Sequence, residues 1–340
     1  MLGSRTYNHP VVVTGGAGFL GTELVKQLLE AGCPDVRVVD LHPYPEGSDR
    51  VRSFSLDIRS GELHAAFAGA KTVLHLAACQ YHSPLAKTTY RLPFFGVNVD
   101  GTRRLLAAAE EHDLERFVFV STNMVYGLPQ SLPLREDHPK IPIGPYGHSK
   151  LEAEKYVEQA HGRKLDTAIV RPGLIVGPGR IGVIARVFDW ILGNKPVVLI
   201  GRGDNRYELT SSFDVASLVF KAGLARGHAV YNTSSANVPT MREWISHVIE
   251  HAGSRSRIIG IPGQPLKLAL QVLEKARISP LRGDQYEIAD LDYYMDTTRA
   301  RNELDWRPRF SGLEAVLDTF RWYTSAERKN AASHARATAR

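Results

Sequence analysis

The stretch Val11-Val12-Val13-Thr14-Gly15-Gly16-Ala17-Gly18-Phe19-Leu20-Gly21 decides the fold of this chain. Its three β-branched residues predict a buried strand, and apolar residues at 24, 25, 28 and 29 then repeat at helical spacing. Glycines allow a sharp turn between the two and let a pyrophosphate approach the backbone, while the first N–H groups of the helix attract an anion. The turn therefore predicts a dinucleotide site, with contacts expected from Gly15, Gly18, Phe19, Leu20 and Gly21.

An acidic residue further along supports this interpretation. Asp40 ends a second predicted strand, 36–40, and lies 19 residues after Gly21. A carboxylate at this spacing accepts hydrogen bonds from the adenosine ribose and would repel a 2′-phosphate. Since the residues that follow, 41–43, include no arginine, the sequence predicts NAD rather than NADP as the cofactor.

The composition is that of a globular protein. Of the 340 residues, 43% are hydrophobic and 23% charged, and the net charge of +6 lies partly in a polar C-terminal tail, so no nucleic-acid partner is expected. The sequence has no long apolar run and no apolar segment before the first strand, so we expect neither a membrane span nor a secretory signal. The two cysteines, Cys33 and Cys79, suit a reducing cytoplasm and offer no metal-ligand spacing, so no metal site is expected.

Further predicted strands end in residues that suit a ligand at the carboxyl edge of a parallel sheet. Asp57 and Ile58 follow a short strand predicted at 51–56. Asp57 either reaches the adenine amino group, with Ile58 beside the ring, or caps a helix that begins near Gly61. The sequence leaves both interpretations open.

A buried strand predicted at 72–78 leads to the same edge. It contains His75 within its apolar run, so we interpret His75 as a hydrogen-bonded core residue. The strand ends in Leu76-Ala77-Ala78, whose small side chains leave room for the cofactor. Asn98 lies near the start of a helix predicted at 97–109, where it either caps the helix or ties neighbouring loops at the cofactor site.

The chemistry is expected from hydroxyl groups and one amine. Ser121 and Thr122 end an apolar strand at 117–122, and Tyr146 and Lys150 lie four residues apart, on one face of a predicted helix. A tyrosine hydroxyl titrates at about pH 10 in water, and a neighbouring ammonium group and a cationic nicotinamide ring both favour its phenolate. Tyr146 and Thr122 would then move a proton at a substrate oxygen, while Lys150 holds the nicotinamide ribose.

In this order, these residues resemble the extended branch of the short-chain dehydrogenase/reductase superfamily, the NAD-dependent epimerase/dehydratase family. The matches cover roughly the first 180 residues, and such a series is highly specific. They are Gly15, Gly18 and Gly21, Asp40, Asp57-Ile58, 75–78, 98–102, Ser121-Thr122 with 125–127, Tyr146 and Lys150, and Arg171-Pro172 with Gly177-Pro178. The resemblance implies that Tyr146 is the catalytic acid/base, Lys150 its partner and Thr122 the third member of the triad. It also implies a homodimer through the helices at 97–112 and 145–161.

The expected fold is α/β, a Rossmann-type doubly wound parallel sheet with a smaller C-terminal substrate-binding lobe. Residues 1–172 would form the NAD-binding domain, to which 205–250 returns. The lobe would comprise 173–204 and 251–325, and 326–340 would be a flexible tail. The elements predicted in the later part of the chain are helices at 183–192, 214–225 and 266–276 and a strand at 197–200.

The later part of the chain resembles the family less closely. Nucleotide-sugar enzymes of this group usually carry an asparagine where this chain has Leu174 and an arginine where it has Tyr207. The helix predicted at 266–276 belongs to the lobe or forms a surface for a partner. It looks like the corresponding helix of hydroxysteroid dehydrogenase relatives. Arginines in the lobe suit a diphosphate instead, because guanidinium groups form bidentate hydrogen bonds. Substrate contacts are expected from Tyr81, Asn123, Arg180, Arg206 and Arg282.

The leading hypothesis is an NAD-dependent epimerase acting on a small molecule, a nucleotide-sugar. Because Asn123 and Met124 follow Thr122, the acidic pair that a dehydratase needs for eliminating water is absent, and epimerisation is preferred. The alternative is an NAD-dependent dehydrogenase of a secondary alcohol, similar to 3β-hydroxysteroid dehydrogenases, which exchanges its cofactor in every turnover. A non-catalytic NAD-binding regulator is less favoured, since it would not need the complete triad.

Overall fold

The computed structural model describes residues 6–81, 92–162, 165–180, 182–276, 278–279 and 281–325. The tail predicted at 326–340 lies outside these ranges. Contacts within the chain group it into two compact units. The first contains Met1–Gly173, Ser212–Thr233 and Met295–Arg307, and the second contains Leu174–Ser211, Ser234–Tyr294 and Pro308–Arg340.

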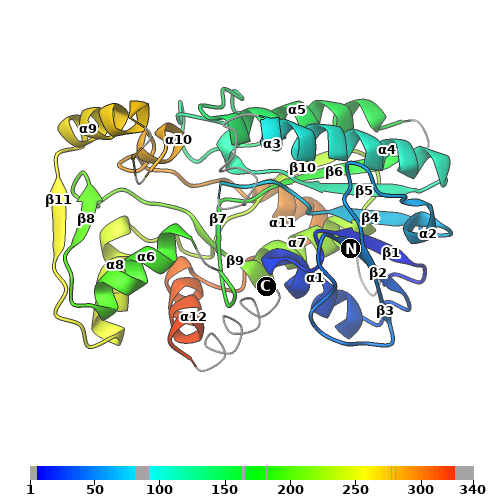
Figure 1. The fold of residues 1–340 in the computed structure, drawn as a ribbon, viewed down its shortest axis with the longest axis horizontal. Coiled ribbons are helices and arrows are strands. Elements are labelled where there is room, and N and C mark those ends of the chain that lie inside the picture. Colours follow the sequence, from blue (N-terminus) through cyan, green and yellow to red (C-terminus); the bar gives the residue numbers. More distant parts are fainter. Residues whose placement is uncertain are drawn as a thin grey trace. The chain divides into compact units, whose positions relative to one another are not determined.

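The first unit is built on one sheet of seven parallel strands, in the order β3-β2-β1-β4-β5-β6-β10 (Figure 1). The strands are β1 (Val11–Thr14), β2 (Val36–Asp40), β3 (Val51–Ser55), β4 (Thr72–His75), β5 (Arg116–Val120), β6 (Asp166–Arg171) and β10 (Ala229–Asn232). The order runs outward from β1 in both directions, as in a doubly wound sheet. The predicted fold class is confirmed.

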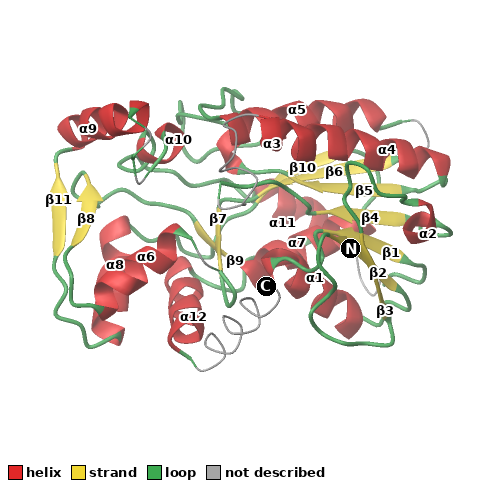
Figure 2. Ribbon diagram, viewed as in Figure 1, coloured by secondary structure: helices red, strands yellow, loops and turns green. Residues whose placement is uncertain are grey.

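Helices cover both faces of this sheet (Figure 2). Successive residues of a strand point to opposite faces, and accordingly Val11 and Val13 belong to one apolar core and Val12 to the other. The first core includes α1 (Phe19–Glu30), α7 (Ser212–Leu224) and α11 (Thr298–Leu304), and the second includes α2 (His64–Phe67), α4 (Thr102–Glu111) and α5 (Pro145–Ala160). Burial on both faces explains why the strands appear in the sequence as uninterrupted apolar runs.

The second unit holds two small parallel sheets and its own core. β7 (Leu174–Val176) pairs with β9 (Leu209–Ser211), and β8 (Val197–Ile200) pairs with β11 (Ile258–Ile261). The helices are α6 (Val183–Leu192), α8 (Met241–His251), α9 (Gly263–Lys275), α10 (Gly283–Tyr286) and α12 (Gly312–Thr324). The helix predicted at 183–192 and the strand predicted at 197–200 are confirmed. The helix predicted at 266–276 is α9, which buries Leu270 and exposes Leu268 and Val272.

Two predictions of local structure are wrong. The helix expected near Gly61 begins at His64, and its N-terminus has no side-chain cap, so Asp57 does not cap it. The helix expected at 97–109 is preceded by α3 (Leu92–Phe95) and begins as a π-helix, η2 (Gly96–Gly101), before α4 starts. Asn98 lies inside η2 and therefore does not cap a helix. Single π-helical turns are frequent at functional sites.

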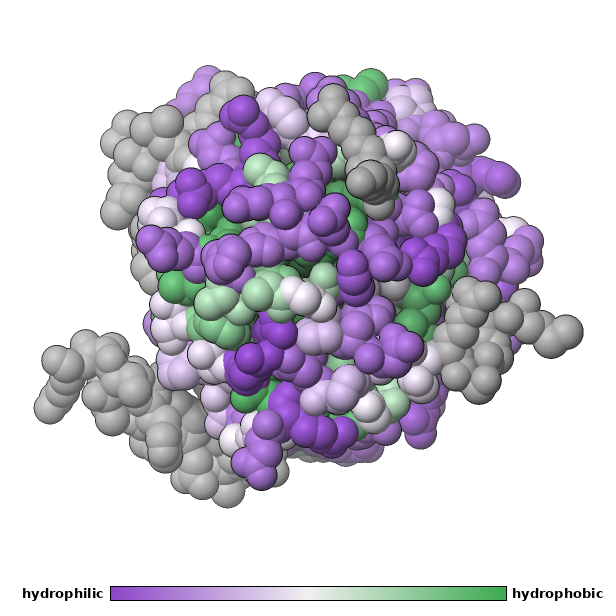
Figure 3. Space-filling model, turned by 90° about the vertical axis from the view of Figure 1, so that its right-hand side faces the viewer, coloured by the Kyte–Doolittle hydropathy of each residue, from purple (hydrophilic) through white to green (hydrophobic). Residues whose placement is uncertain are grey.

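The surface of the molecule has an ordinary polar character on the face that Figure 3 shows. Hydrophilic side chains cover most of this face, and apolar side chains form small patches between them. Large apolar side chains lie mainly in the cores described above, which is the usual distribution in a folded domain. In the described part of the chain, no helix is long and apolar enough to cross a membrane.

The glycine turn gives a prediction about stability. A Cβ atom on Gly21 would overlap the carbonyl oxygen of Gly15, which is backbone and cannot rotate away. We expect Gly21→Ala to lower the free energy of unfolding by about 1–3 kcal/mol, the usual cost of overpacking, in urea titrations. Gly96→Ala is the matched control, because nothing lies within 4 Å of its Cβ position, and it should cost nothing. If the two variants were equally stable, the turn would have space for a methyl group at position 21.

Candidate active site

The predicted cofactor residues lie at the carboxyl edge of the sheet. Gly15 donates its N–H to the Val39 carbonyl at 2.8 Å, which ties the turn after β1 to the end of β2. The carboxylate of Asp40, at the end of β2, accepts a hydrogen bond from the Ala17 N–H at 3.1 Å. The acid and the glycine turn are therefore adjacent, as a site for the adenosine ribose and the pyrophosphate requires.

The turn itself leaves no space for side chains. Gly15 has a φ of +73°, and a Cβ atom there would lie 2.6 Å from the backbone nitrogen of Ala77. Because Ala77 follows β4, the loop after β4 packs directly on the turn after β1. A side chain at position 15 would overlap this loop, so the close packing of the two segments requires glycine there.

The start of α5 is packed against the loop that carries Thr122. A Cβ atom on Gly147 would lie 2.6 Å from the Met124 carbonyl oxygen, so the helix lies against the 3₁₀ turn η3 (Asn123–Val125). Thr122 is the N-cap of this turn, and its Oγ1 accepts a hydrogen bond from the Met124 N–H at 3.2 Å. The contact places the first turn of α5, which contains Tyr146, against the 3₁₀ turn that follows Thr122.

Tyr146 lies among aromatic rings at this point. Its ring centroid is 5.7 Å from that of Tyr81 and 6.1 Å from that of Phe94. Tyr146 is 9% exposed and shares a small core with Cys79 and Phe94. Of the predicted substrate residues, Tyr81 and Asn123 are thus near Tyr146 or Thr122. The segment 82–91, which follows Tyr81, lies outside the described residues.

The buried side chain of Lys150 is the strongest indication of a ligand site. It is 1% exposed, and its Nζ lies 4.2 Å from the centroid of the Phe119 ring. Among the described residues, neither this Nζ nor the Oγ of Ser121 has a hydrogen-bond partner. Burial lowers the pKa of Lys150 to about 7. A buried amine and a buried hydroxyl that lack acceptors fit the ribose and amide groups of a nicotinamide nucleotide.

Two residues of the site are structural. His75 is fully buried, with its ring nitrogens 2.6 Å from Thr14 Oγ1 and 2.9 Å from Thr102 Oγ1, and burial holds its pKa well below the usual range. This confirms the prediction of a core histidine. Asn98 accepts a hydrogen bond from the Cys79 N–H and donates to Ser149 Oγ at 2.9 Å. Its amide therefore ties the loop after β4 to α5, as one of the two interpretations predicted.

Asp57 forms an ion pair with Arg59. Its carboxylate accepts hydrogen bonds from Arg59, at 3.0 Å from Nε and 2.6 Å from Nη2, and this partner holds the pKa of Asp57 below its usual range. Ile58 is buried beneath η2, where its Cδ1 lies 2.6 Å from the Cβ position of Gly101. Contacts of both residues with adenine stay a prediction.

A buried network that the sequence reasoning missed fixes α5. Arg171, at the end of β6, donates to the Glu154 carboxylate through Nε at 2.9 Å and Nη2 at 2.8 Å, and both side chains are almost completely buried. Nη1 of Arg171 also donates to the Tyr126 hydroxyl at 3.0 Å, and this hydroxyl donates to Asn232 at 2.7 Å. Glu154 lies one helical turn after Lys150, so the spacing in the sequence indicates that the two side chains lie on the same face of α5.

The comparison with known proteins identifies the family. The family model described as NAD dependent epimerase/dehydratase family matches residues 11–233. The chain belongs to this family. Its members are NAD-dependent enzymes of the extended short-chain dehydrogenase/reductase type, which confirms the predicted resemblance, enzyme class and cofactor.

Several named proteins are similar to this chain over most of its length. A UDP-glucose 4-epimerase of Mycolicibacterium smegmatis is 28% identical over 331 residues, covering 92% of this chain and 97% of that protein. A 3-beta-hydroxysteroid dehydrogenase of Mycolicibacterium neoaurum is 29% identical over 346 residues, covering 94% and 93%. The solved structure of MoeE5 in complex with UDP-glucose and NAD has a TM-score of 0.75 and 27% identity, covering 92% of this chain and 98% of that one.

The predicted site residues of this epimerase/dehydratase fall in both compact units. The cofactor residues, the three triad residues, Tyr81 and Asn123 belong to the first unit, while Arg180, Arg206 and Arg282 belong to the second. Arg206 is exposed, and its guanidinium lies 5.8 Å from the Tyr294 ring centroid. Contacts of these arginines with a substrate stay a prediction.

The buried Lys150 gives a prediction about pH. In the unfolded chain a lysine titrates at about pH 10.4, so between pH 7 and that value the unfolded state binds one more proton and stability rises with pH. Lys150→Met removes the buried charge. We expect it to raise the free energy of unfolding at pH 6 by about 1–4 kcal/mol and to flatten the rise above pH 7.

The matched control is Lys155→Met, on the same helix, where the lysine is exposed and paired with Glu152. Urea titrations from pH 6 to 9 on all three proteins measure the effect. If Lys150→Met and Lys155→Met had the same pH dependence, the amine of Lys150 would be solvated in the folded protein.

Proposed function

We propose that this protein is an NAD-dependent epimerase of a nucleotide-sugar. The observation that carries the proposal is the buried amine of Lys150, which has no hydrogen-bond partner among the described residues and lies one helical turn from Tyr146. The same unit holds the glycine turn and Asp40 of a dinucleotide site. The 27% identity to MoeE5, solved with UDP-glucose and NAD, supports this class of substrate. The arginines of the second unit, Arg180, Arg206 and Arg282, suit its diphosphate.

The proposed reaction needs a proton and a hydride to leave one carbinol. Bound NAD supplies the acceptor for the hydride. Tyr146 removes the hydroxyl proton, and the Thr122 hydroxyl, oriented by its bond to the Met124 N–H, hydrogen-bonds the same oxygen. The ammonium form of Lys150 favours the phenolate and holds the ribose in place. Reversal of these steps from the opposite face of the sugar carbon gives the epimer.

The alternative is a dehydrogenase of a secondary alcohol that releases its product. A 3-beta-hydroxysteroid dehydrogenase is 29% identical over almost the whole chain, and Leu174 stands where nucleotide-sugar enzymes usually carry an asparagine. Both reactions use the same triad. Dehydration is disfavoured, because Asn123 and Met124 follow Thr122 and offer no acidic pair.

We also propose a cytoplasmic homodimer. The resemblance supports dimerisation through the segments 97–112 and 145–161, which contain the whole of α4 and the whole of α5. Arg103 of α4 lies over the Tyr156 ring of α5 at 5.1 Å, which joins these two helices at their surface. Cys33 and Cys79 are buried and are not joined to each other or to another residue by a disulfide, which supports a reducing compartment.

Cofactor retention distinguishes the two reactions. An epimerase regenerates its cofactor in place, so we expect the purified, denatured protein to release close to one NAD per chain in an enzymatic assay. An empty protein whose turnover depends on added NAD, with one equivalent reduced per product, would favour the dehydrogenase and overturn the epimerase proposal.

Substitution of Tyr146 tests the mechanism. Tyr146→Phe removes the hydroxyl that takes the proton in the proposed reaction, so we expect turnover to fall at least about 100-fold while the NAD content stays unchanged. Tyr156→Phe, on the same helix and half-buried, is the matched control and should keep its activity. Full activity in Tyr146→Phe would exclude this residue as the acid/base.

A further inference from the structure

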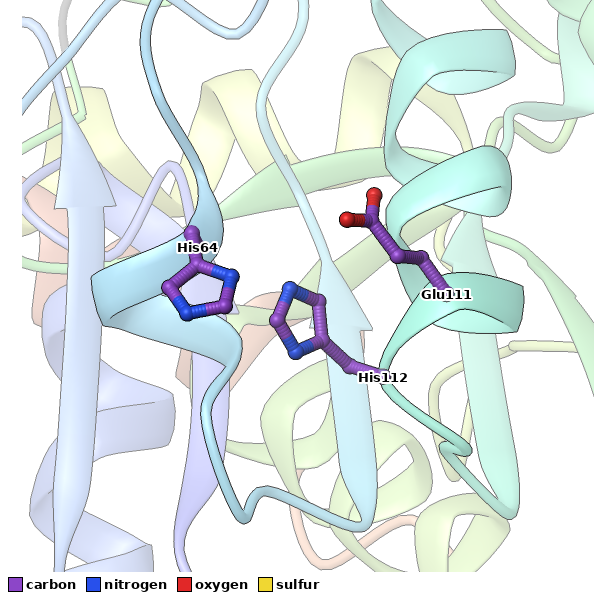
Figure 4. Close-up of side chains that lie close together, drawn as sticks. All are labelled: His64, Glu111 and His112. Carbon is purple, nitrogen blue, oxygen red and sulfur yellow. The ribbon is translucent and has the colours of Figure 1, made fainter.

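A second group of chemically active side chains lies in the first unit, apart from the triad. His64 is the first residue of α2, Glu111 is the last residue of α4, and His112 is the C-cap of that helix. Their ligand atoms, two ring nitrogens and a carboxylate oxygen, all lie within 4.8 Å of one another. Figure 4 shows the three side chains turned toward a common space between the two helices.

Buried packing sets the spacing of the two histidines. Ala66 and Phe67 of α2 and Leu105 and Ala109 of α4 belong to one core. The ring of Phe67 lies 6.1 Å from that of His112, and the two imidazole rings lie 4.6 Å apart. The packing of α2 and α4 in one core therefore holds the two histidines near each other, although they lie 48 positions apart in the sequence.

We propose that His64, Glu111 and His112 bind one divalent transition-metal ion of the zinc class. Two imidazoles and one carboxylate are a donor set typical of zinc, whereas magnesium and calcium prefer oxygen ligands only. Ligand atoms around a tetrahedral zinc ion are about 3.4 Å apart, given bonds of about 2.1 Å. His64 and Glu111 are exposed, so small side-chain rotations close the gap, and water completes the coordination.

The position of the ion would make it structural. α2 leads into the start of β4, and His112 comes just before the start of β5, so the group lies at the amino-terminal edge of the sheet. The triad and the glycine turn lie at the opposite, carboxyl edge. An ion here would cross-link α2 to α4 and stabilise the folded state by binding it selectively.

The experiment uses the full-length protein after removal of metal with EDTA. Isothermal titration with Zn²⁺ should show one ion per chain, and the thermal midpoint should rise with Zn²⁺ concentration. Co²⁺ should give visible d–d absorption of a site with nitrogen ligands. His64→Gln and His112→Gln should each weaken Zn²⁺ binding at least tenfold, and turnover should not change.

The matched control is His247→Gln, because His247 and His251 are exposed and lie one turn apart on α8, a spacing at which two histidines can also bind a metal ion. It should leave the affinity unchanged. Unfolding curves in EDTA, which should coincide for all variants, show that each variant folds. Three results would overturn the proposal: no Zn²⁺ binding, unchanged binding in His64→Gln and His112→Gln, or loss of binding in His247→Gln.

Discussion

The buried ion pair between Arg171 and Glu154 is the constraint on which the geometry of the site depends. Removing two charges from water costs several kcal/mol for each ion, and only complete hydrogen bonding offsets this. Here the guanidinium uses Nε and Nη2 for the carboxylate and Nη1 for the Tyr126 hydroxyl and the Glu136 carbonyl. Such a pair tolerates little displacement. It therefore fixes the rotation of α5 about its own axis and the position of α5 along β6.

The same network holds the loop that follows Thr122. Tyr126, just after η3, donates to Asn232 at the end of β10, and the Asn232 amide donates to the Leu134 carbonyl at 3.1 Å. Burial raises the pKa of Tyr126 to about 12, so its hydroxyl stays a donor. The two residues to which we assign proton transfer, Thr122 before this loop and Tyr146 on α5, are thus positioned by one set of buried polar groups.

The sequence predicted what depends on neighbouring residues. The strands are predictable because burial on both faces selects apolar residues along their whole length. The turn at 15–21 is predictable because only glycine fits its contacts. The Tyr146–Lys150 pair is predictable because helical spacing places both side chains on one face. The π-helix at 96–101, the network around Arg171 and the histidine pair of α2 and α4 were not predicted. The network and the histidine pair each join residues from distant segments, and a local pattern does not show which segments meet.

The division of the chain into two units has a consequence for the chemistry. The triad, the glycine turn and Asp40 all lie in the first unit, together with the network that positions them. Leu174, Tyr207 and the three candidate arginines lie in the second unit. In the function that we propose, the residues that transfer the proton can therefore stay the same while the candidate substrate residues of the second unit change. Such a division is consistent with the matches of a UDP-glucose 4-epimerase and a 3-beta-hydroxysteroid dehydrogenase, each of which covers more than nine-tenths of this chain.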